Sequence, residues 1–294
     1  MTLLELILDT ERQLTQAAVH FGHGTTNAHD EAAWLVLHAA GLPLDADLDN
    51  ASVAGQLVTS EQQSGVAELL RARIQTRKPL AYLTHEAWLQ GVPFYVDERT
   101  IVPRSLIAEA LADGSIDPWL TSDTRRVLDL CTGNGSLAVL AAMAWPEVAV
   151  DAADISLDAL AVARINVDKH QMGERIRLIE SDGLAQCKGP YDLILCNPPY
   201  VNRDSMEALP AEYQAEPSLA LAGGTDGMDF IRDLLAAAPS YLSKTAVIVL
   251  EIGHEREHFE AAFPHLSPVW LDTSAGSDQV LLLTADMLQP SSAH

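Results

Sequence analysis

The run Asn197-Pro198-Pro199-Tyr200 carries the side chains best suited to chemistry on a planar nitrogen. The lone pair of an amide or exocyclic amine nitrogen is delocalised, so the nitrogen is a poor nucleophile. Two acceptors fixed on its two N–H groups would localise that pair and aim it. The Asn197 side-chain oxygen and the Pro198 carbonyl suit this role, because proline fixes the backbone direction. Tyr200 could lie against the planar group, and no ionisable general base is needed if the incoming group carries positive charge. The alternative interpretation is a stiff turn after a strand.

A glycine loop, Cys131-Thr132-Gly133-Asn134-Gly135, follows the strand-like run Arg126–Leu130 and precedes an apolar helical stretch from Ser136. Glycines let a ligand approach the backbone, and the helix start supplies free N–H donors. A G-x-G pattern alone is weak evidence, because tight turns also need glycine. The order of strand, loop and helix nevertheless indicates a cofactor site.

Three acidic residues support that interpretation. Asp129 ends the first strand, where its carboxylate could hold the loop or the amino group of a cofactor's amino-acid part. Asp154 ends the next strand and could accept both hydroxyls of a ribose, although it could instead compete with Ser156 as a helix cap. Asp182, in Ser181-Asp182-Gly183, could accept a hydrogen bond from an adenine amino group or occupy a solvent-facing turn. The lack of G-x-G-x-x-G weakens a nicotinamide interpretation and is compatible with a nucleoside lacking a pyrophosphate.

These residues need a sheet to position them. From Arg126 onward, strand-like apolar runs alternate with helical stretches. This alternation predicts an α/β fold with parallel βαβ units in a doubly wound sheet, whose last two strands form an antiparallel pair at the edge. The predicted strands are 127–130, 148–153, 176–180, 193–196, 246–252, 269–271 and 280–283. Asn197 follows the fourth strand, beside the crevice where open α/β sheets bind ligands.

The first eighty residues predict a small helical domain. Apolar residues at helical spacing run from Leu3 to Ala18, a second helix runs from Asp30 to Gly41, and a third begins at the Ser60-x-x-Gln63 capping pattern. Aromatic and β-branched residues around Gly91 then predict a short β-hairpin. We therefore expect a helical domain at 1–80, a hairpin linker at 81–103 and a larger domain at 104–294.

The chain is strongly acidic, with 41 acidic and 18 basic residues and a formal net charge of -23. This charge should repel free nucleic acid, since only short basic clusters such as Arg71-Ala72-Arg73 and Arg77-Lys78 occur. A basic protein partner would be attracted, although the acidity could also serve solubility alone.

Cys131, Cys187 and Cys196 are too few and too scattered for a disulfide framework or a zinc set, so we expect reduced thiols and no metal. No apolar run reaches the roughly 20 residues of a membrane span. The N-terminus does not resemble a signal peptide. These features predict a cytoplasmic protein without membrane contact.

Taken together, these residues make the sequence resemble the protein-(glutamine-N5) methyltransferases of the translation apparatus over nearly its whole length. The resemblance is carried by Asp129–Gly135, Asp154-Ile155-Ser156, Asn197–Tyr200, Glu216-Pro217 and Gly223–Gly227. It implies a seven-stranded, Rossmann-like methyltransferase domain, S-adenosylmethionine as methyl donor, a glutamine side chain on a protein as acceptor, and no metal. It also implies that the cofactor is bound by Asp129, Cys131, Thr132, Gly133, Asn134, Gly135, Asp154, Asp182, Gly183 and Asn197.

Within this family, Phe94–Arg99 and Val102–Glu109 look like the branch that acts on large-subunit ribosomal protein three (uL3). The release-factor branch carries Pro-Arg-Pro-Glu-Thr-Glu at that place. Gly22–Thr25 and Asp30-Glu31-Ala32 also resemble the uL3 branch, whereas Leu106 departs from its usual proline. Gly183 stands where release-factor relatives often have a bulky residue against adenine. The branch implies a basic ribosomal protein as substrate, which the acidic charge would attract.

Three other functions stay open at this stage. Release factors could be the glutamine substrate, and a similar Asn-Pro-Pro-Tyr site serves adenine N6-methyltransferases, although the negative charge argues against nucleic acid. An assembly factor could hold a ribosomal protein without chemistry, but it would have no need of the acceptor pair at Asn197 and Pro198. The helical domain is expected to read the substrate, by elimination only.

Overall fold

The computed structural model describes residues 1–289 and divides the chain into two compact units. The helical unit comprises Met1–Ala87 together with Leu209–Glu216, and the sheet unit comprises Trp88–Ala208 and the chain from Pro217 onward. The segment Leu209–Glu216 lies inside the sequence range expected for the larger domain, yet it belongs to the helical unit. Within the described residues, no helix has the length and apolar character that crossing a membrane requires.

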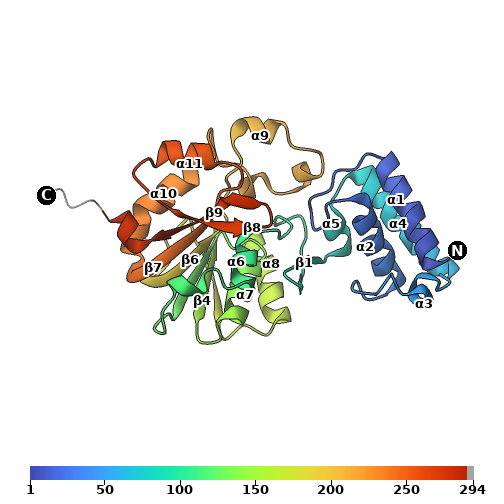
Figure 1. The fold of residues 1–294 in the computed structure, drawn as a ribbon, viewed down its shortest axis with the longest axis horizontal. Coiled ribbons are helices and arrows are strands. Elements are labelled where there is room, and N and C mark those ends of the chain that lie inside the picture. Colours follow the sequence, from blue (N-terminus) through green and yellow to red (C-terminus); the bar gives the residue numbers. More distant parts are fainter. Residues whose placement is uncertain (290–294) are drawn as a thin grey trace. The chain divides into compact units, whose positions relative to one another are not determined.

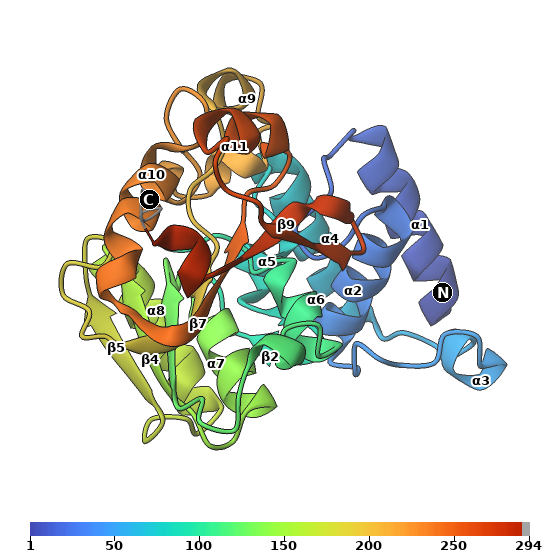
Figure 2. The same ribbon diagram turned by 60° about the vertical axis from the view of Figure 1, so that its left-hand side comes forward.

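The helical unit is built from three main helices, α1, α2 and α4, which pack side by side (Figures 1 and 2). Its helices are α1 (Leu3–Gln16), α2 (Ala28–Ala40), α3 (Ala51–Ala54), α4 (Ser60–Thr76) and α5 (Leu80–Thr84). The predicted cap of α4 at Ser60 was wrong by one residue. Thr59 has an extended backbone and caps the helix: its hydroxyl accepts from the Gln62 N–H at 3.2 Å, while the Gln62 side chain accepts from the Thr59 N–H at 2.9 Å.

A buried ionic cluster in the helical unit holds Leu209–Glu216. The Arg73 side chain is only 1% exposed, and its Nε donates to Glu31 Oε1 at 2.7 Å. Its Nη1 lies 3.3 Å from Glu212 Oε1, and its Nη2 donates to the His20 carbonyl at 2.8 Å. Arg77 also reaches Glu212, at 3.3 Å. Arg73 and Arg77, which belong to the short basic clusters of the sequence, therefore neutralise internal carboxylates. Few basic side chains of these clusters are left to form a basic surface.

Replacing Arg73 with methionine is expected to lower the free energy of unfolding by about 3–5 kcal/mol, because buried Glu31 would lose its cation and buried Glu212 would keep only Arg77. Urea denaturation would measure this. The matched control is Arg71→Met, since Arg71 is exposed on the same helix and its loss should change stability by no more than about 0.5 kcal/mol. Equal unfolding free energies for the two variants would contradict the role given to the cluster.

The sheet unit contains a seven-stranded sheet in the order β5-β4-β3-β6-β7-β9-β8 (Figure 1). Strands β3 to β7 are parallel, while β9 runs antiparallel to both β7 and β8. The strands are β3 (Arg126–Leu130), β4 (Ala149–Asp154), β5 (Ile176–Glu180), β6 (Tyr191–Cys196), β7 (Leu242–Glu251), β8 (Val269–Thr273) and β9 (Gly276–Thr284). The predicted doubly wound α/β fold with an antiparallel pair at its edge is confirmed. Separately, β1 (Ala87–Leu89) and β2 (Val92–Phe94) form a two-stranded sheet.

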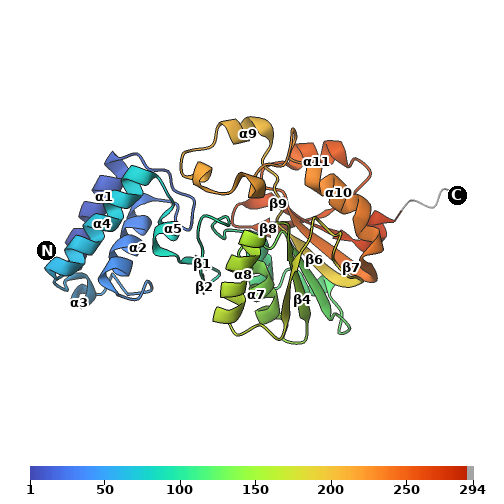
Figure 3. The same ribbon diagram turned by 180° about the vertical axis from the view of Figure 1, so that it is seen from behind.

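Helices cover both faces of this sheet (Figures 1 and 3). Alternate residues of the strands pack against α6, α7 and α8 on one face, in a core that includes Val127 and Leu193. The intervening residues, such as Leu128 and Ile194, pack against α10 and α11 on the other face. The helices of this unit are α6 (Ile107–Ala112), α7 (Ser136–Ala144), α8 (Leu157–Lys169), α9 (Arg203–Glu207), α10 (Asp229–Ala237) and α11 (Arg256–Ala262). The short 3-10 turns of this unit are η1 (Asp117–Trp119), η3 (Ser218–Ala220), η4 (Ala238–Ser240) and η5 (Ala285–Leu288), whereas η2 (Tyr213–Ala215) belongs to the helical unit. Burial on both faces explains the nearly continuous apolar runs of the central strands.

Candidate active site

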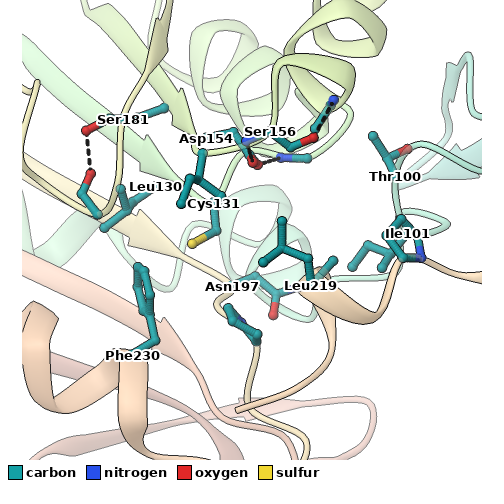
Figure 4. Close-up of a pocket in the computed structure, with 18 of the residues that line it drawn as sticks. Thr100, Ile101, Leu130, Cys131, Asp154, Ser156, Ser181, Asn197, Leu219 and Phe230 are labelled. Carbon is teal, nitrogen blue, oxygen red and sulfur yellow. Dashed lines mark hydrogen bonds between the residues drawn. The ribbon is translucent and has the colours of Figure 1, made fainter. Parts of the chain in front are cut away.

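A cavity of about 220 Å³ lies at the carboxyl ends of β3, β4 and β6 (Figure 4). Parallel strands end at the same edge of a sheet, so the loops that follow them converge there. Seven residues predicted from the sequence line the cavity: Cys131, Gly133, Asp154, Asp182, Gly183, Asn197 and Pro199. Six others lie outside its lining, namely Asp129, Thr132, Asn134, Gly135, Pro198 and Tyr200. The sheet therefore brings the two predicted motifs, the glycine loop and Asn-Pro-Pro-Tyr, to one cavity.

The glycine loop turns sharply between β3 and α7. Cys131, Gly133 and Gly135 all have positive φ angles, of 61°, 55° and 81°. Gly133 faces open space, so its lack of a side chain serves the backbone turn and leaves the cavity clear. Gly135 is needed for packing, since a Cβ there would lie 3.1 Å from Cβ of Ala163 on α8.

Asp129 is fully buried beneath this loop. Its Oδ2 accepts hydrogen bonds from the Thr132 hydroxyl and from the Ala138 N–H, the latter at 2.9 Å. Its Oδ1 is buried and has no hydrogen-bond partner among the described residues. Burial raises the pKa of Asp129 to about 7, against the opposing hydrogen bonds from Thr132 and Ala138. An unpartnered buried carboxylate oxygen is costly, and it suits a ligand that brings a cationic amino group.

Asp154 joins the loop to the cavity. Its Oδ2 accepts the Gly133 N–H and its Oδ1 the Ser156 N–H, both at 2.9 Å (Figure 4). Burial raises its pKa, although these backbone donors oppose the shift. The cap of α8 is Ser156, whose hydroxyl accepts the Ala159 N–H at 3.1 Å. Since a carboxylate oxygen can accept more than one hydrogen bond, Asp154 keeps capacity for two ligand hydroxyls.

The loop after β5 forms the far end of the cavity, with Asp182 and Gly183 in its wall. Ser181 shapes this loop: its hydroxyl donates to the Gly183 carbonyl at 2.7 Å (Figure 4). The same hydroxyl accepts the Gln186 N–H at 3.0 Å. Phe230 lines the same end, and it was not singled out in the sequence. It offers an apolar surface beside the small Gly183.

Asn197 enters the cavity from the end of β6 (Figure 4). The backbone that follows is held by a second glycine loop. The Val201 N–H donates to the Leu221 carbonyl at 2.8 Å, and the Gly223 N–H donates to the Val201 carbonyl at 2.9 Å. A Cβ on Gly223 would lie 2.8 Å from the Pro199 carbonyl oxygen, and one on Gly227 would lie 2.3 Å from that of Tyr200. Glycines 223 and 227 therefore let this loop pack directly on the Asn-Pro-Pro-Tyr backbone.

The cavity also has a wall that sequence reasoning missed. Its further lining residues are Arg99, Thr100, Ile101, Leu130, Ala153, Ile155, Ser156, Ala159, Ser181, Pro217, Leu219, Ala220 and Phe230. Most are apolar and follow no local pattern that separates them from ordinary core or loop residues. Position was the only available signal: Ile155 and Ser156 directly follow Asp154, and Pro217 belongs to the Glu-Pro pair noted in the sequence.

The Cys131 thiol lines the cavity, but we expect it to be unreactive. The neighbouring Cys196 thiol and burial raise the pKa of Cys131 well above its usual value. The thiolate is the nucleophilic form of cysteine, so a neutral thiol does not point to a covalent step. All three cysteines are free.

Comparisons with known proteins identify the family. A protein of Bordetella pertussis named ribosomal protein uL3 glutamine methyltransferase is 53% identical over 293 residues, covering 98% of this chain and 96% of that protein. Proteins of the same name from Burkholderia pseudomallei and Bradyrhizobium diazoefficiens are 47% and 42% identical, covering 98% and 97% of this chain and 95% and 91% of those proteins. The chain belongs to the ribosomal protein uL3 glutamine methyltransferases. The sequence resemblance to this branch is confirmed.

Two further comparisons concern the methyltransferase domain and its fold. The family described as methyltransferase small domain matches residues 115–212, from before β3 to beyond Asn197. Among solved structures, the hMettl16 catalytic domain aligns with a TM-score of 0.53 at 13% identity, covering 74% of this chain and 81% of that chain. That likeness shows a shared fold.

Proposed function

We propose that this protein transfers the methyl group of S-adenosylmethionine to the side-chain amide nitrogen (N5) of a glutamine in ribosomal protein uL3. The observation that carries the proposal is the position of Asn197, whose amide lines the same cavity as Asp154 and the glycine loop. The names of the full-length relatives favour uL3 over release factors as substrate. A ribosomal protein substrate supports placing the reaction in the cytoplasm.

The residues of the cavity suit the cofactor. Asp154, in the cavity lining, keeps lone pairs that fit ribose hydroxyls, whereas Asp129 lies outside the lining, beneath the glycine loop, and its unpartnered Oδ1 would pair with a cationic amino group that reaches past that loop. Phe230 offers an apolar wall for adenine beside Gly183, with Asp182 as the polar partner. We assign no cofactor contact to the side chains of Thr132 and Asn134: Thr132 donates to Asp129, and the Asn134 side-chain oxygen accepts the Ser136 N–H at 3.2 Å. These two side chains hold the loop.

When bound, S-adenosylmethionine supplies a methyl group on a positively charged sulfonium. Asn197 Oδ1 and the Pro198 carbonyl would accept the two N–H groups of the glutamine amide, which localises the nitrogen lone pair and aims it. Held in this way by Asn197 and Pro198, the amide nitrogen would face the methyl group that the bound cofactor would supply, and the electron pair of the broken C–S bond would stay on sulfur. The surplus amide proton then leaves to water, so positioning supplies most of the rate.

Labelled S-adenosylmethionine offered in parallel with uL3, a release factor and DNA tests the assignment. We expect label on a glutamine of uL3. Label on release factor alone, on adenine, or nowhere would overturn the proposal.

The pH dependence of cofactor binding tests the role of Asp129. A cationic amino group favours the ionised carboxylate, and the pKa of Asp129 without ligand is about 7. Affinity for S-adenosylmethionine is therefore expected to rise with pH below 7, by up to about tenfold per pH unit, and then level off as the carboxylate becomes fully ionised. Calorimetric titration between pH 5.5 and 7.5 would measure this. The Asp129→Asn variant should bind more weakly and lose the slope, and an unchanged slope in that variant would exclude Asp129 as its source.

The acidic charge predicts salt-sensitive encounter with a basic substrate. Added salt should raise the KM for uL3, because steering by charge weakens as ions screen it. Methylation rates measured across a salt series, with cofactor saturating, would show this. A KM for uL3 that did not change with salt would mean that the acidity serves another purpose.

A further inference from the structure

Glu251 is a buried acid at the end of β7 that the proposed chemistry leaves without a role. Glu251 is only 4% exposed, and its carboxylate accepts hydrogen bonds from three donors. The Ser105 hydroxyl donates to Oε2 at 2.6 Å and the Leu106 N–H to the same oxygen at 2.9 Å. The Tyr200 hydroxyl donates to Oε1 at 3.3 Å. One carboxylate therefore links Tyr200 of the Asn-Pro-Pro-Tyr run to Ser105.

The Tyr200 ring is confined from a second side by Gly253. A Cβ on Gly253 would lie 2.5 Å from Cε2 of the ring and 3.1 Å from Cζ. Gly253 also has a φ of 54°, which glycine adopts at little cost. The Tyr200 ring thus packs against the backbone of Gly253, two residues after Glu251, whose carboxylate accepts the Tyr200 hydroxyl. The segment Glu251–Gly253 fixes both the plane and the tip of Tyr200.

The same segment continues to a second acid that holds the next polar residue. Glu255 Oε1 accepts a hydrogen bond from Asn202 Nδ2 at 2.6 Å, and Glu255 is 7% exposed. Glu255 also pairs with His258. Two buried acids, one at the end of β7 and one just after it, therefore flank the stretch from Tyr200 to Asn202. Of these two acids, Glu251 is the one that forms a hydrogen bond with Tyr200, which belongs to the predicted substrate site.

The direction in which the Tyr200 hydroxyl donates its proton follows from its partner, Glu251. The Tyr200 hydroxyl donates to Glu251 Oε1, so its proton points toward that carboxylate. A glutamine at position 251 could instead donate to the phenol oxygen, which would reverse the direction of the hydroxyl proton. The donors from Ser105 and Leu106 occupy the other carboxylate oxygen and fix the orientation of the Glu251 side chain.

We propose that Glu251, oriented by Ser105, is a positioning residue that fixes the ring and hydroxyl of Tyr200 in the proposed substrate site. This role rests on the proposed function, because Tyr200 is placed there in the substrate site. Glu251 itself touches neither substrate nor cofactor. Its effect should therefore fall on the KM for uL3, while cofactor affinity stays unchanged.

A double-mutant cycle between Glu251→Gln and Tyr200→Phe tests the proposal. Each single variant is expected to raise the KM for uL3 by about tenfold to a hundredfold, the range for losing a charge-assisted hydrogen bond. In the Tyr200→Phe background, Glu251→Gln should add less than about twofold, since its target is gone. Glu255→Gln is the matched control. Its fold-change in the KM for uL3 should multiply with that of Tyr200→Phe, as expected for two independent sites. A full additional effect of Glu251→Gln in the Phe background would overturn the role.

A spectroscopic measurement decides the contact without relying on activity. Tyrosine carrying ¹³C at the ring carbon that bears the hydroxyl would give a Tyr200 signal, assigned by its loss in Tyr200→Phe. We expect this signal to shift in Glu251→Gln and in the milder Ser105→Ala, which serves if the first variant does not fold. An unshifted signal in the folded variants would refute the proposal. Failure of the wild-type protein to label uL3 would instead defeat the proposed function, and the spectrum would still decide whether Glu251 positions Tyr200.

Discussion

Replacing Asn197 with alanine is expected to lower kcat for methylation of uL3 by about 10²–10³-fold, the usual cost of losing one preorganised polar group that acts on the reacting centre. The amide nitrogen would lose the acceptor that localises its lone pair, and the Pro198 carbonyl alone cannot hold both N–H groups. Asn197 lines the cavity at the end of β6, so the loss occurs where we propose that the cofactor and the acceptor meet.

The informative control for Asn197→Ala is cofactor binding in the same variant. The Kd for S-adenosylmethionine should change by less than about threefold, because Asp129, Asp154 and the glycine loop remain. Single-turnover rates with saturating cofactor would separate chemistry from binding. Loss of cofactor binding together with activity would mean that Asn197 holds the cofactor and not the amide. A rate within tenfold of wild type would remove it from the mechanism.

Replacing Asp154 with alanine is expected to weaken S-adenosylmethionine binding by at least about a hundredfold. Two losses combine. The ribose hydroxyls would lose a charged acceptor, worth roughly 1.5–3 kcal/mol for each hydrogen bond, and the Gly133 N–H would lose the carboxylate that fixes the glycine loop. Calorimetric titration would measure the loss directly.

Asp158→Ala provides the matched control for Asp154→Ala. Asp158 is an exposed acid in the first turn of α8, close in sequence but outside the cavity lining. Its replacement should leave the cofactor Kd within about twofold of wild type, a difference of under 0.5 kcal/mol. If Asp154→Ala bound the cofactor as tightly as Asp158→Ala, the ribose role would have to be given up.

The central strands could be predicted because they are buried on both faces and read as continuous apolar runs. Their starts were less visible. Strand β7 begins at Leu242, well before the predicted start at residue 246, because Leu242–Thr245 are partly or fully exposed and carry no apolar signal. The helix cap at Thr59 was misplaced for a similar local reason: Thr59 and Ser60 are both good caps, and only the extended backbone of Thr59 decides between them.

In the site, glycines and acids after strands were predictable because few residue types perform those roles. Phe230 and Leu219 were not, since an apolar residue in a cavity wall resembles one in the core. Glu251 was also hidden. A single acid at the end of a strand gives no sign that it will be buried with Ser105 and Tyr200, which lie far from it in the sequence.

The place of Leu209–Glu216 in the helical unit has a consequence for how the protein can be divided. The chain enters that unit twice, so the first 87 residues are not a detachable module. Deleting them would remove Arg73 and Arg77, and Glu212 would lose both of these ion-pair partners. Glu212 lies on a loop that continues directly to Pro217 and Leu219 of the cavity wall. A truncated enzyme would need that loop shortened or redesigned to remain folded. By the same reasoning, exchanging helical units between relatives requires exchanging both segments together.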